Sequence, residues 1–121
     1  MHLSDAEWTV MDAVWDAARP VSARDVHGAV AARAGWAYTT VKTQLDRLAR
    51  KGALQADRAA RVTLYAAAVT RSAARRSALG SLLERAFDGA AAPLLRFVVR
   101  ERSLTRKERA ELVRLLRKEG R

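Results

Sequence analysis

Three helix patterns followed by two short alternating runs fill the first 69 residues, and this order constrains the fold more than any other feature of the sequence. The first helix is predicted over about residues 5–18. Ser4 and Glu7 open it with the spacing of a capping box, in which each side chain accepts a hydrogen bond from the other residue's backbone amide. Because apolar residues line two sides of this helix, we expect it to sit centrally, with its acidic strip (Asp5, Asp12 and Asp16) facing away from any polyanion.

Two further helices follow before the alternating runs. The second is predicted over about residues 22–34, with Ser22 as its cap and Gly35 at its end. The third is predicted over about residues 39–51, with Thr39 as its cap. The apolar residues that mark the inner face of this third helix are Val41, Leu45 and Leu48.

Two runs, residues 53–58 and 61–67, alternate apolar with polar residues and are predicted to form a β-hairpin that turns near Ala59 and Ala60. The side chains expected to face inward are Leu54, Ala56, Val62, Leu64 and Ala66. Three helices followed by a hairpin is the order of a winged helix-turn-helix. We therefore predict a mainly α fold with a small β wing, and place its first domain at residues 1–69.

From Thr70 onward the pattern is purely helical, and residues 70–121 are predicted to form a second domain of three amphipathic helices. About fifty residues of this kind cannot seal a core alone. We expect them to pack against a second copy, and a two-fold homodimer is the commonest such arrangement. The residues predicted to line this dimerisation interface are Leu79, Leu82, Leu83, Phe87, Leu94, Leu95, Phe97, Val98, Leu112, Val113, Leu115 and Leu116.

The outer face of the third helix carries short hydroxyl side chains and guanidinium groups, where Glu and Lys would make a more ordinary solvated face. Threonine lets a helix approach the floor of a DNA groove, and arginine suits a guanine edge or a phosphate. A solvated face stays open for any single residue, but the place of this helix directly before a hairpin favours recognition of the major groove of double-stranded DNA. The residues predicted to contact DNA here are Tyr38, Thr39, Thr40, Lys42, Thr43, Arg47 and Arg50.

Asp46 argues against this interpretation, because phosphates repel a carboxylate. Lys42 or Arg50, each four residues away, is expected to neutralise it. Arg58 and Arg61 flank the hairpin turn, and they either solubilise an edge strand or contact the DNA backbone or adjacent minor groove as a wing at residues 58–61.

The charge of the chain favours a polyanionic partner. The 121 residues include 23 Lys and Arg against 13 Asp and Glu, a net charge of +10, and 19 of the basic residues are Arg. Residues 1–69 hold nine basic and seven acidic residues (+2), whereas residues 70–121 hold fourteen and six (+8). The excess in the second region has three interpretations: solvated faces, ion pairs across a dimer, or further contacts with the DNA backbone.

The sequence offers little for catalysis, metal binding or membrane insertion. It has no Cys, which excludes disulfides, thiolate metal sites and cysteine nucleophiles. His27 has no acidic partner one helical turn away, and no phosphate-binding loop or HExxH pattern occurs. No apolar run is long enough to span a bilayer, and the first residues are acidic, unlike a signal peptide. We predict a cytoplasmic protein that is not an enzyme and uses no cofactor.

Three segments resemble the penicillinase-repressor (BlaI/MecI/CopY) family: LSDAEWTVMDAVW at residues 3–15, WAYTTVKTQLDRLARKGAL at 36–54 and APLLRFVVRERSLTRKERAELVRLL at 92–116. The resemblance implies a homodimeric transcriptional repressor that occludes a promoter by sitting on a palindromic operator. In resistance members it also implies a membrane sensor protease that triggers cleavage in the dimerisation region. The family's groove-facing and wing positions correspond to Thr39, Thr40, Lys42, Thr43, Arg47 and Arg61.

The chain departs from the family pattern in several places. Asp46 stands where a basic residue is common, and Arg96-Phe97 aligns with the Asn-Phe bond that is cut in resistance members. The copper-responsive branch senses metal through C-terminal cysteines, which this chain lacks. Two alternatives to the repressor stay open: a winged-helix regulator that binds a small ligand between its halves, and a protein-protein adaptor whose winged helix does not touch DNA.

Overall fold

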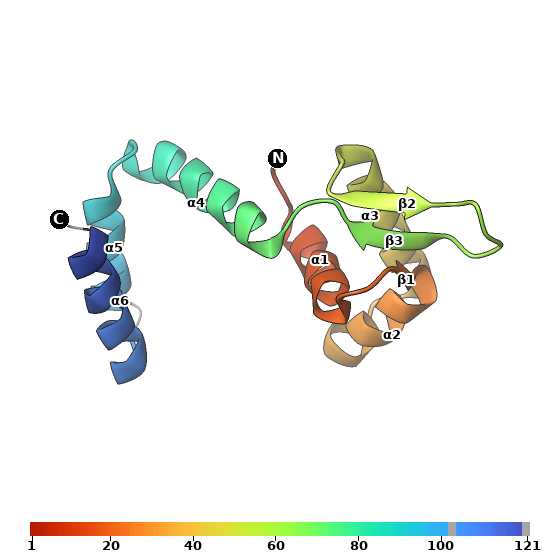
Figure 1. Cartoon of the computed structure of the whole chain (residues 1–121), viewed down its shortest axis with the longest axis horizontal. Coiled ribbons are helices and arrows are strands. Elements are labelled where there is room, and N and C mark those ends of the chain that lie inside the picture. Colours follow the sequence, from red (N-terminus) through yellow and green to blue (C-terminus); the bar gives the residue numbers. More distant parts are fainter. Residues whose placement is uncertain (102–103, 120–121) are drawn as a thin grey trace. The chain divides into compact units, whose positions relative to one another are not determined.

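Six helices and three short strands make up the part of the chain that the structure describes (Figure 1). The structure is a computed structural model that describes residues 1–101 and 104–119, with side chains as far as residue 114. Its two compact units are residues 1–78 and 79–121. The elements are α1 (Asp5–Ala17), β1 (Val21–Ser22), α2 (Ala23–Ala34), α3 (Tyr38–Lys51), β2 (Leu54–Asp57), β3 (Leu64–Ala67), α4 (Arg71–Phe87), α5 (Ala91–Glu101) and α6 (Arg106–Glu119).

The first unit is built around one apolar core. Helices α1, α2 and α3 pack against one another, α1 also contacts β3, and α3 also contacts β2. The strands form an antiparallel sheet in the order β1-β3-β2, so β3 is the central strand. This arrangement confirms the predicted winged helix-turn-helix fold, in which the β2–β3 hairpin is the wing. The tryptophans pack partly buried at the edge of the core: Trp8, Trp15 and Trp36.

The first two helices begin and end where local sequence signals place them. Ser4 and Glu7 form a complete capping box at α1, and Ser22 forms another with Asp25 at α2. Gly35 ends α2 in the left-handed region with φ of 67°, a conformation that a residue without Cβ adopts at little cost. Each of these signals acts over only three or four residues, which is why sequence alone reveals them.

The predicted cap of the third helix is wrong. Helix α3 begins at Tyr38, and Ala37 occupies the cap position in an extended conformation with no side-chain hydrogen bond. The carbonyl of Ala37 already accepts hydrogen bonds from the amides of Thr40 and Val41, at 3.1 and 3.2 Å. Thr39 therefore lies within the first helical turn, and its exposed side chain is not used for capping.

The predicted inward residues of the second hairpin strand are also wrong. Tyr65 is the fully buried residue of β3, whereas Val62 and Leu64 are 54% and 36% exposed and Ala66 is only half-buried. Val62 lies in the loop before β3, so it could not set the phase of the strand. Tyr65 is paired across the sheet with Ala56, the partly buried residue of β2, and the two share the inner face.

A third strand escaped prediction because two residues carry no periodicity. Val21 and Ser22 pair with Tyr65 and Leu64, which makes β3 the centre of the sheet. The strand β1 thus joins the start of α2 to the wing.

A buried ion pair ties the end of α3 to the start of α1. Glu7 is only 1% exposed, and its Oε1 lies 2.6 Å from Lys51 Nζ and accepts a hydrogen bond of 2.8 Å from the amide of Ser4. Burial raises the pKa of the Glu7 carboxyl, but the hydrogen bonds from Lys51 and Ser4 outweigh burial and hold the pKa below its ordinary value. Glu7 therefore both caps α1 and anchors the last turn of α3.

Arg71 joins the start of α4 to α1. Its guanidinium lies 2.6 Å from Asp16 Oδ1, 3.5 Å from Asp12 Oδ1 and 5.3 Å from the centroid of the Trp15 ring. The indole N–H of Trp15 donates to the carbonyl of Val69 at 3.0 Å. Asp12 and Asp16 of the acidic strip on α1 thus fix the chain where it leaves the sheet and enters α4.

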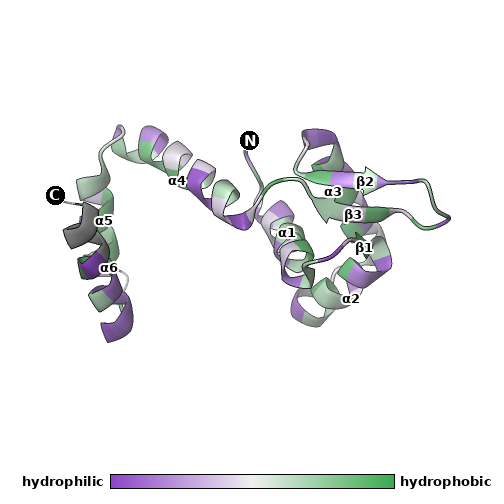
Figure 2. Ribbon diagram, in the orientation of Figure 1, coloured by the Kyte–Doolittle hydropathy of each residue, from purple (hydrophilic) through white to green (hydrophobic). Residues whose placement is uncertain are grey.

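The second unit consists of the rest of α4 with α5 and α6, whose residues range from hydrophilic to hydrophobic (Figure 2). A capping box of Thr105 and Glu108 opens α6, with hydrogen bonds of 3.0 and 3.1 Å. Helix α5 begins two residues before Pro93, which fits because proline is tolerated in a first helical turn. The boundary between the two compact units falls within α4, and the assignment of residues 70–121 to dimerisation stays a prediction.

Replacing Lys51 with Met should lower the free energy of unfolding by about 2 to 3 kcal/mol at neutral pH, because breaking a buried pair costs about 3 to 5 kcal/mol and Lys51 is partly exposed. The pKa of Glu7 is lowered in the folded protein, so the pair's contribution is complete above the ordinary carboxyl pKa and disappears as pH falls through the lowered value. Denaturant unfolding across pH should therefore show the variant and the wild type converging in acid. The control is Arg50→Met, an exposed neighbour, expected to change stability by less than about 0.5 kcal/mol.

Candidate nucleic-acid interface

The outer face of α3 is polar and exposed, directly opposite its buried face. Val41, Leu45 and Leu48 are fully buried, and burial of each such side chain is worth about 1.5 to 3 kcal/mol. Together they fix the rotation of α3 about its own axis. The side chains that this rotation leaves exposed are Thr39, Thr40, Thr43, Arg47 and Arg50.

The hydroxyl of Thr43 is already used within the helix. It donates a hydrogen bond of 2.9 Å to the carbonyl of Thr39, the residue one turn earlier. Its oxygen still has acceptor capacity, and the bond restricts the rotation of the side chain. Thr43 therefore presents a methyl group and an acceptor in a fixed orientation, a surface suited to a thymine methyl or a base amino group.

Lys42, another predicted DNA contact, lies at the edge of this face and is engaged with two neighbours. Its Nζ lies 3.1 and 3.3 Å from the two carboxylate oxygens of Asp46 and 2.7 Å from the hydroxyl of Tyr65. The Tyr65 hydroxyl in turn donates to Asp46 Oδ1 at 2.9 Å. The three side chains, from α3 and β3, form a closed hydrogen-bonded triangle.

Asp46 is neutralised, as predicted, by Lys42. Its second described ion pair is with Arg58 of the wing at 3.8 Å, and not with the alternative candidate Arg50. Burial raises the pKa of the Asp46 carboxyl, but hydrogen bonds from Lys42 and Tyr65 outweigh it, and the pKa lies below its ordinary value. The hydrogen bond with Tyr65, followed by that with Asp46, raises the pKa of Lys42. The carboxylate is thus charged and its charge is balanced locally.

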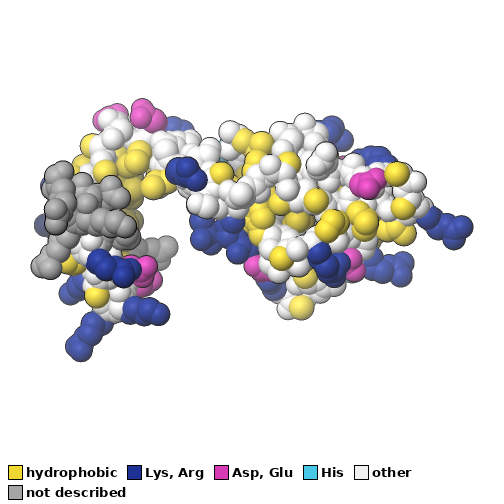
Figure 3. All heavy atoms as spheres, viewed as in Figure 1, with side chains coloured by type: hydrophobic (Ala, Val, Ile, Leu, Met, Phe, Trp, Pro, Cys, Tyr) yellow, Lys and Arg dark blue, Asp and Glu magenta, His cyan; other side chains and the backbone are white. Residues whose placement is uncertain are grey.

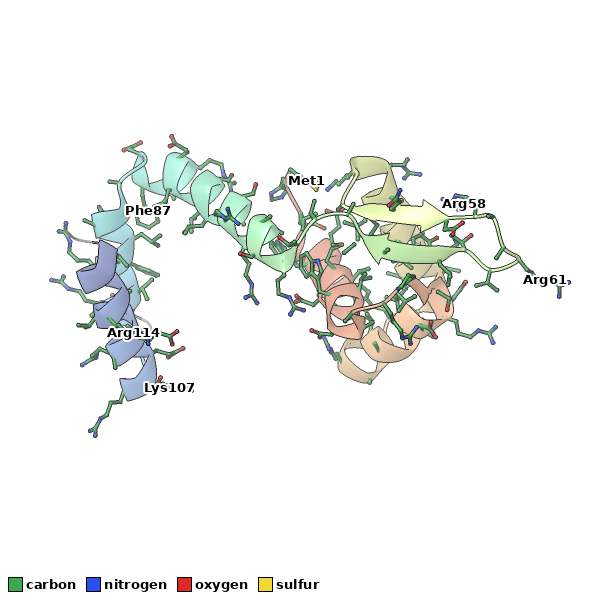
Figure 4. The ribbon with its side chains drawn as sticks, in the orientation of Figure 1. Met1, Arg58, Arg61, Phe87, Lys107 and Arg114 are labelled. Carbon is green, nitrogen blue, oxygen red and sulfur yellow. The ribbon has the colours of Figure 1, made fainter. Side chains whose placement is uncertain are left out.

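The wing carries its two arginines on an exposed loop between β2 and β3. Arg58 directly follows β2, and Arg61 lies farther along the loop with its side chain pointing away from the sheet (Figure 4). The carboxylate of Asp57 accepts a hydrogen bond of 3.0 Å from the amide of Ala59, which shapes the turn locally. The structure thus places both predicted wing residues at the end of the hairpin.

A hollow of about 430 Å³ lies between the start of α2, the start of α3 and the wing. Tyr38 at its rim is 45% exposed and packs edge-on against His27, with ring centroids 5.8 Å apart. His27 also makes a 2.9 Å hydrogen bond with the carbonyl of Trp36, so its role here is to hold the α2–α3 corner. The residues that line the hollow are Ser22, Ala23, Arg24, Tyr38, Lys42, Val62, Thr63 and Tyr65.

Those residues predicted for dimerisation whose side chains the structure describes are partly or largely exposed, and hydrophobic side chains show on the surface where α4 ends and α5 begins (Figure 3). Those with large exposed fractions are Leu79 (47%), Leu82 (40%), Phe97 (51%) and Val113 (43%). The half-buried ones are Leu83, Phe87, Leu94, Leu95, Val98 and Leu112. The side chains of Leu115 and Leu116 lie outside the described residues. Arg96-Phe97, the predicted counterpart of the cut bond, lies within α5.

Within the described ranges, the structure holds no cluster of three or more His, Asp or Glu side chains arranged to bind a metal ion. Helices long and apolar enough to cross a membrane are likewise missing from that part of the chain.

Comparison with known families decides the membership of the chain. The family model described as penicillinase repressor matches residues 3–118. The chain belongs to the penicillinase repressor family. The resemblance seen in the three sequence segments is thereby confirmed, and it extends over almost the whole chain.

Two relatives each match part of the chain. The transcriptional regulator BlaI of Mycobacterium tuberculosis is 45% identical over 65 residues, which is 54% of this chain and 47% of that protein. An uncharacterised 16.5 kDa protein of Latilactobacillus sakei is 32% identical over 83 residues, 69% of this chain and 56% of that protein. The chain spans about half the length of these relatives.

Two solved structures of BlaI resemble part of the chain. The DNA-binding domain of the repressor BlaI superposes with a TM-score of 0.53 at 31% identity, covering 59% of this chain and 85% of that one. Bacillus licheniformis BlaI, in its monomeric form in complex with the blaP half-operator, gives a TM-score of 0.52 at 30% identity, covering 60% and 87%.

Sequence reasoning missed two features that organise the interface, the buried Tyr65 and the pair of Glu7 with Lys51. The alternation of Val62, Leu64 and Ala66 predicted that Tyr65 faces outward, but Tyr65 is fully buried. A large aromatic residue followed by three alanines could have indicated the buried face. The pairing of Glu7 with Lys51 joins residues 44 positions apart, and no local pattern reveals such a contact.

Proposed function

We propose that the chain is a homodimeric transcriptional repressor that binds a palindromic DNA operator and occludes a promoter. The observation that carries the proposal is the outer face of α3, where exposed threonines and arginines stand beside a basic wing on a helix whose rotation is fixed. Membership of the penicillinase repressor family and the likeness to BlaI in complex with a half-operator support it.

Each part of the first unit has a distinct role in this proposal. Thr39, Thr40, Thr43 and Arg47 enter the major groove from α3, with the threonine methyls against bases and the guanidinium at a guanine edge or a phosphate. Arg58 and Arg61 supply sequence-independent affinity to the backbone or the adjacent minor groove. Arg50 and Tyr38, at the two ends of α3, contact phosphates.

The second unit supports a homodimer. Its predicted interface residues keep much of their apolar surface exposed in the single chain, and α5 has no buried residue among its described side chains. Covering that surface with a second copy removes it from water at about 25 cal/mol for each Å². A two-fold pair then presents two copies of α3 to half-sites about one helical turn of DNA apart, or a multiple of it.

Binding to a duplex selected by the protein from genomic DNA should depend steeply on salt. If the dimer neutralises about eight phosphates, the logarithm of the binding constant falls with the logarithm of salt concentration at a slope of about −7. Fluorescence anisotropy over a salt series measures this slope. A binding constant that hardly changed between low and moderate salt would contradict the electrostatic part of the proposal.

The two kinds of arginine should behave differently on alanine substitution. Arg47→Ala should cost about 1 to 3 kcal/mol on the selected site and relax base preference at one position, if the guanidinium contacts a base. Arg61→Ala should weaken binding to the selected site and to random duplex by the same factor. Competition assays with both duplexes separate these outcomes, and equal losses for Arg47→Ala would make it a phosphate contact instead.

A charge in the exposed apolar surface of the second unit should separate the dimer. Leu82→Glu places a carboxylate where the proposal has a second copy, and burying an unpaired charge costs several kcal/mol. Sedimentation equilibrium should give a dimer for the wild type and a monomer for the variant. Ser77→Glu adds the same charge at an exposed position of the same helix and should leave the dimer intact. A monomeric wild type at micromolar concentration would rule out the dimer.

A further inference from the structure

We propose that Lys42 and Asp46 are positioning residues that hold α3, the proposed recognition helix, in a fixed orientation relative to the wing, and that neither of them contacts DNA. This inference rests on the proposed function, and it assigns to Lys42 a role different from the base or phosphate contact that its place in the sequence suggests. The lock is the triangle of Lys42, Asp46 and Tyr65.

The hydrogen bonds of Lys42 are complete without DNA. An ammonium group has three N–H donors, and Lys42 Nζ has three acceptors within 3.3 Å: both carboxylate oxygens of Asp46 and the hydroxyl of Tyr65. The Nζ also lies 5.4 Å from the centroid of the Tyr65 ring. If Lys42 contacted a phosphate or a guanine, it would have to break one of these hydrogen bonds. The free energy gained from the new contact would then be offset by the hydrogen bond lost within the protein.

Tyr65 makes the triangle a link between two elements. It is fully buried and belongs to β3, the central strand, so the sheet positions its hydroxyl. The same hydroxyl donates to Asp46 and accepts from Lys42. Since Lys42 and Asp46 lie one turn apart on α3, the triangle holds two successive turns of the helix against the strand that leads out of the wing.

Arg58 extends the link to the wing loop. Its guanidinium lies 3.8 Å from Asp46 Oδ1, and it is more than half exposed. The carboxylate of Asp46 thus faces one cation from its own helix, one from the wing and one phenol from the sheet. This explains why an acidic residue is tolerated beside a surface proposed to meet phosphates: its charge is compensated and directed toward the protein.

The consequence concerns specificity. A winged-helix protein makes contacts from its helix and from its wing at once, so the angle between the two decides whether both sets fit one duplex. The lock fixes that angle before DNA arrives, which lowers the ordering cost of binding to the correct site. Affinity for random duplex rests mainly on phosphate contacts, so it depends less on a fixed angle between α3 and the wing.

The test compares four proteins on two duplexes, the best site selected by the wild type and a random sequence of equal length. The variants are Lys42→Met, Asp46→Asn and the double variant, in which a neutral pair replaces a pair of opposite charges. Each variant should reduce the ratio of the affinity for the selected site to the affinity for random duplex by about tenfold. The double variant should reduce this ratio no more than either single variant, because each single substitution already breaks the same interaction. The double variant should keep the salt slope of the wild type.

Two further variants show that the lock acts by placing the wing. Arg61→Ala alone weakens binding to both duplexes by the same factor and leaves site preference unchanged. In that background, removing the Lys42–Asp46 pair should cost much less site preference, because the helix no longer has to fit the site together with the wing contact of Arg61. A change of fold stability alone would not depend on Arg61. Glu111→Gln with Arg114→Met removes an exposed pair on α6 in the same neutral manner and should leave site preference unchanged.

A phosphate contact by Lys42 gives the opposite pattern. Because a dimer carries two copies of Lys42, the double variant would then lower the magnitude of the salt slope by about 1.8, and the losses of the single variants would add. Either result overturns the lock while leaving the proposed repressor intact, whereas a wild type that prefers no duplex overturns both. Should the double variant unfold, Tyr65→Phe carries the test, since it removes one hydroxyl and no charge: unchanged site preference in that variant would contradict the lock.

Discussion

The proposed function depends first on the fixed orientation of α3 within the first unit. Three fully buried aliphatic side chains fix the rotation of α3. The ion pair of Lys51 with Glu7 of α1 holds the last turn of α3, and hydrogen bonds of Lys42 and Asp46 with Tyr65 hold its other edge beside the sheet. Because the inner face and both edges are committed, the threonines and arginines of the outer face are presented in one orientation. Recognition by a helix requires this kind of rigid support.

Local signals in the sequence predicted the frame of the first unit, and contacts between distant residues account for what they missed. Capping boxes and terminal glycines act within one helical turn, so α1 and α2 were placed correctly. The strand β1 is too short to show a period, and the phase of β3 was set from Val62, a loop residue. Tyr65 and the pair of Glu7 with Lys51 depend on the approach of segments far apart in the chain. The outer face of α3 was predictable because its buried face obeys helical periodicity.

The distribution of charge within residues 1–69 agrees with the proposed contact between α3, the wing and DNA. Residues 1–69 carry a net charge of only +2, and several of their carboxylates are paired inside the structure: Glu7 with Lys51, Asp46 with Lys42, and Asp16 with Arg71. The charged side chains exposed on the outer face of α3 and in the wing loop are Arg47, Arg50, Arg58 and Arg61. A weak net charge over residues 1–69 is therefore consistent with a basic contact surface, since the three paired carboxylates face the protein and not the proposed partner.

The claim that the outer face of α3 meets the duplex can be tested most directly by nuclear magnetic resonance. Amide and methyl signals of the labelled protein would be followed as a duplex selected by the protein is added. The account predicts the largest changes at Thr39, Thr43 and Arg47, smaller ones at the wing, and little change along the acidic strip of α1. Changes that spared α3 and were confined to the second unit would contradict it.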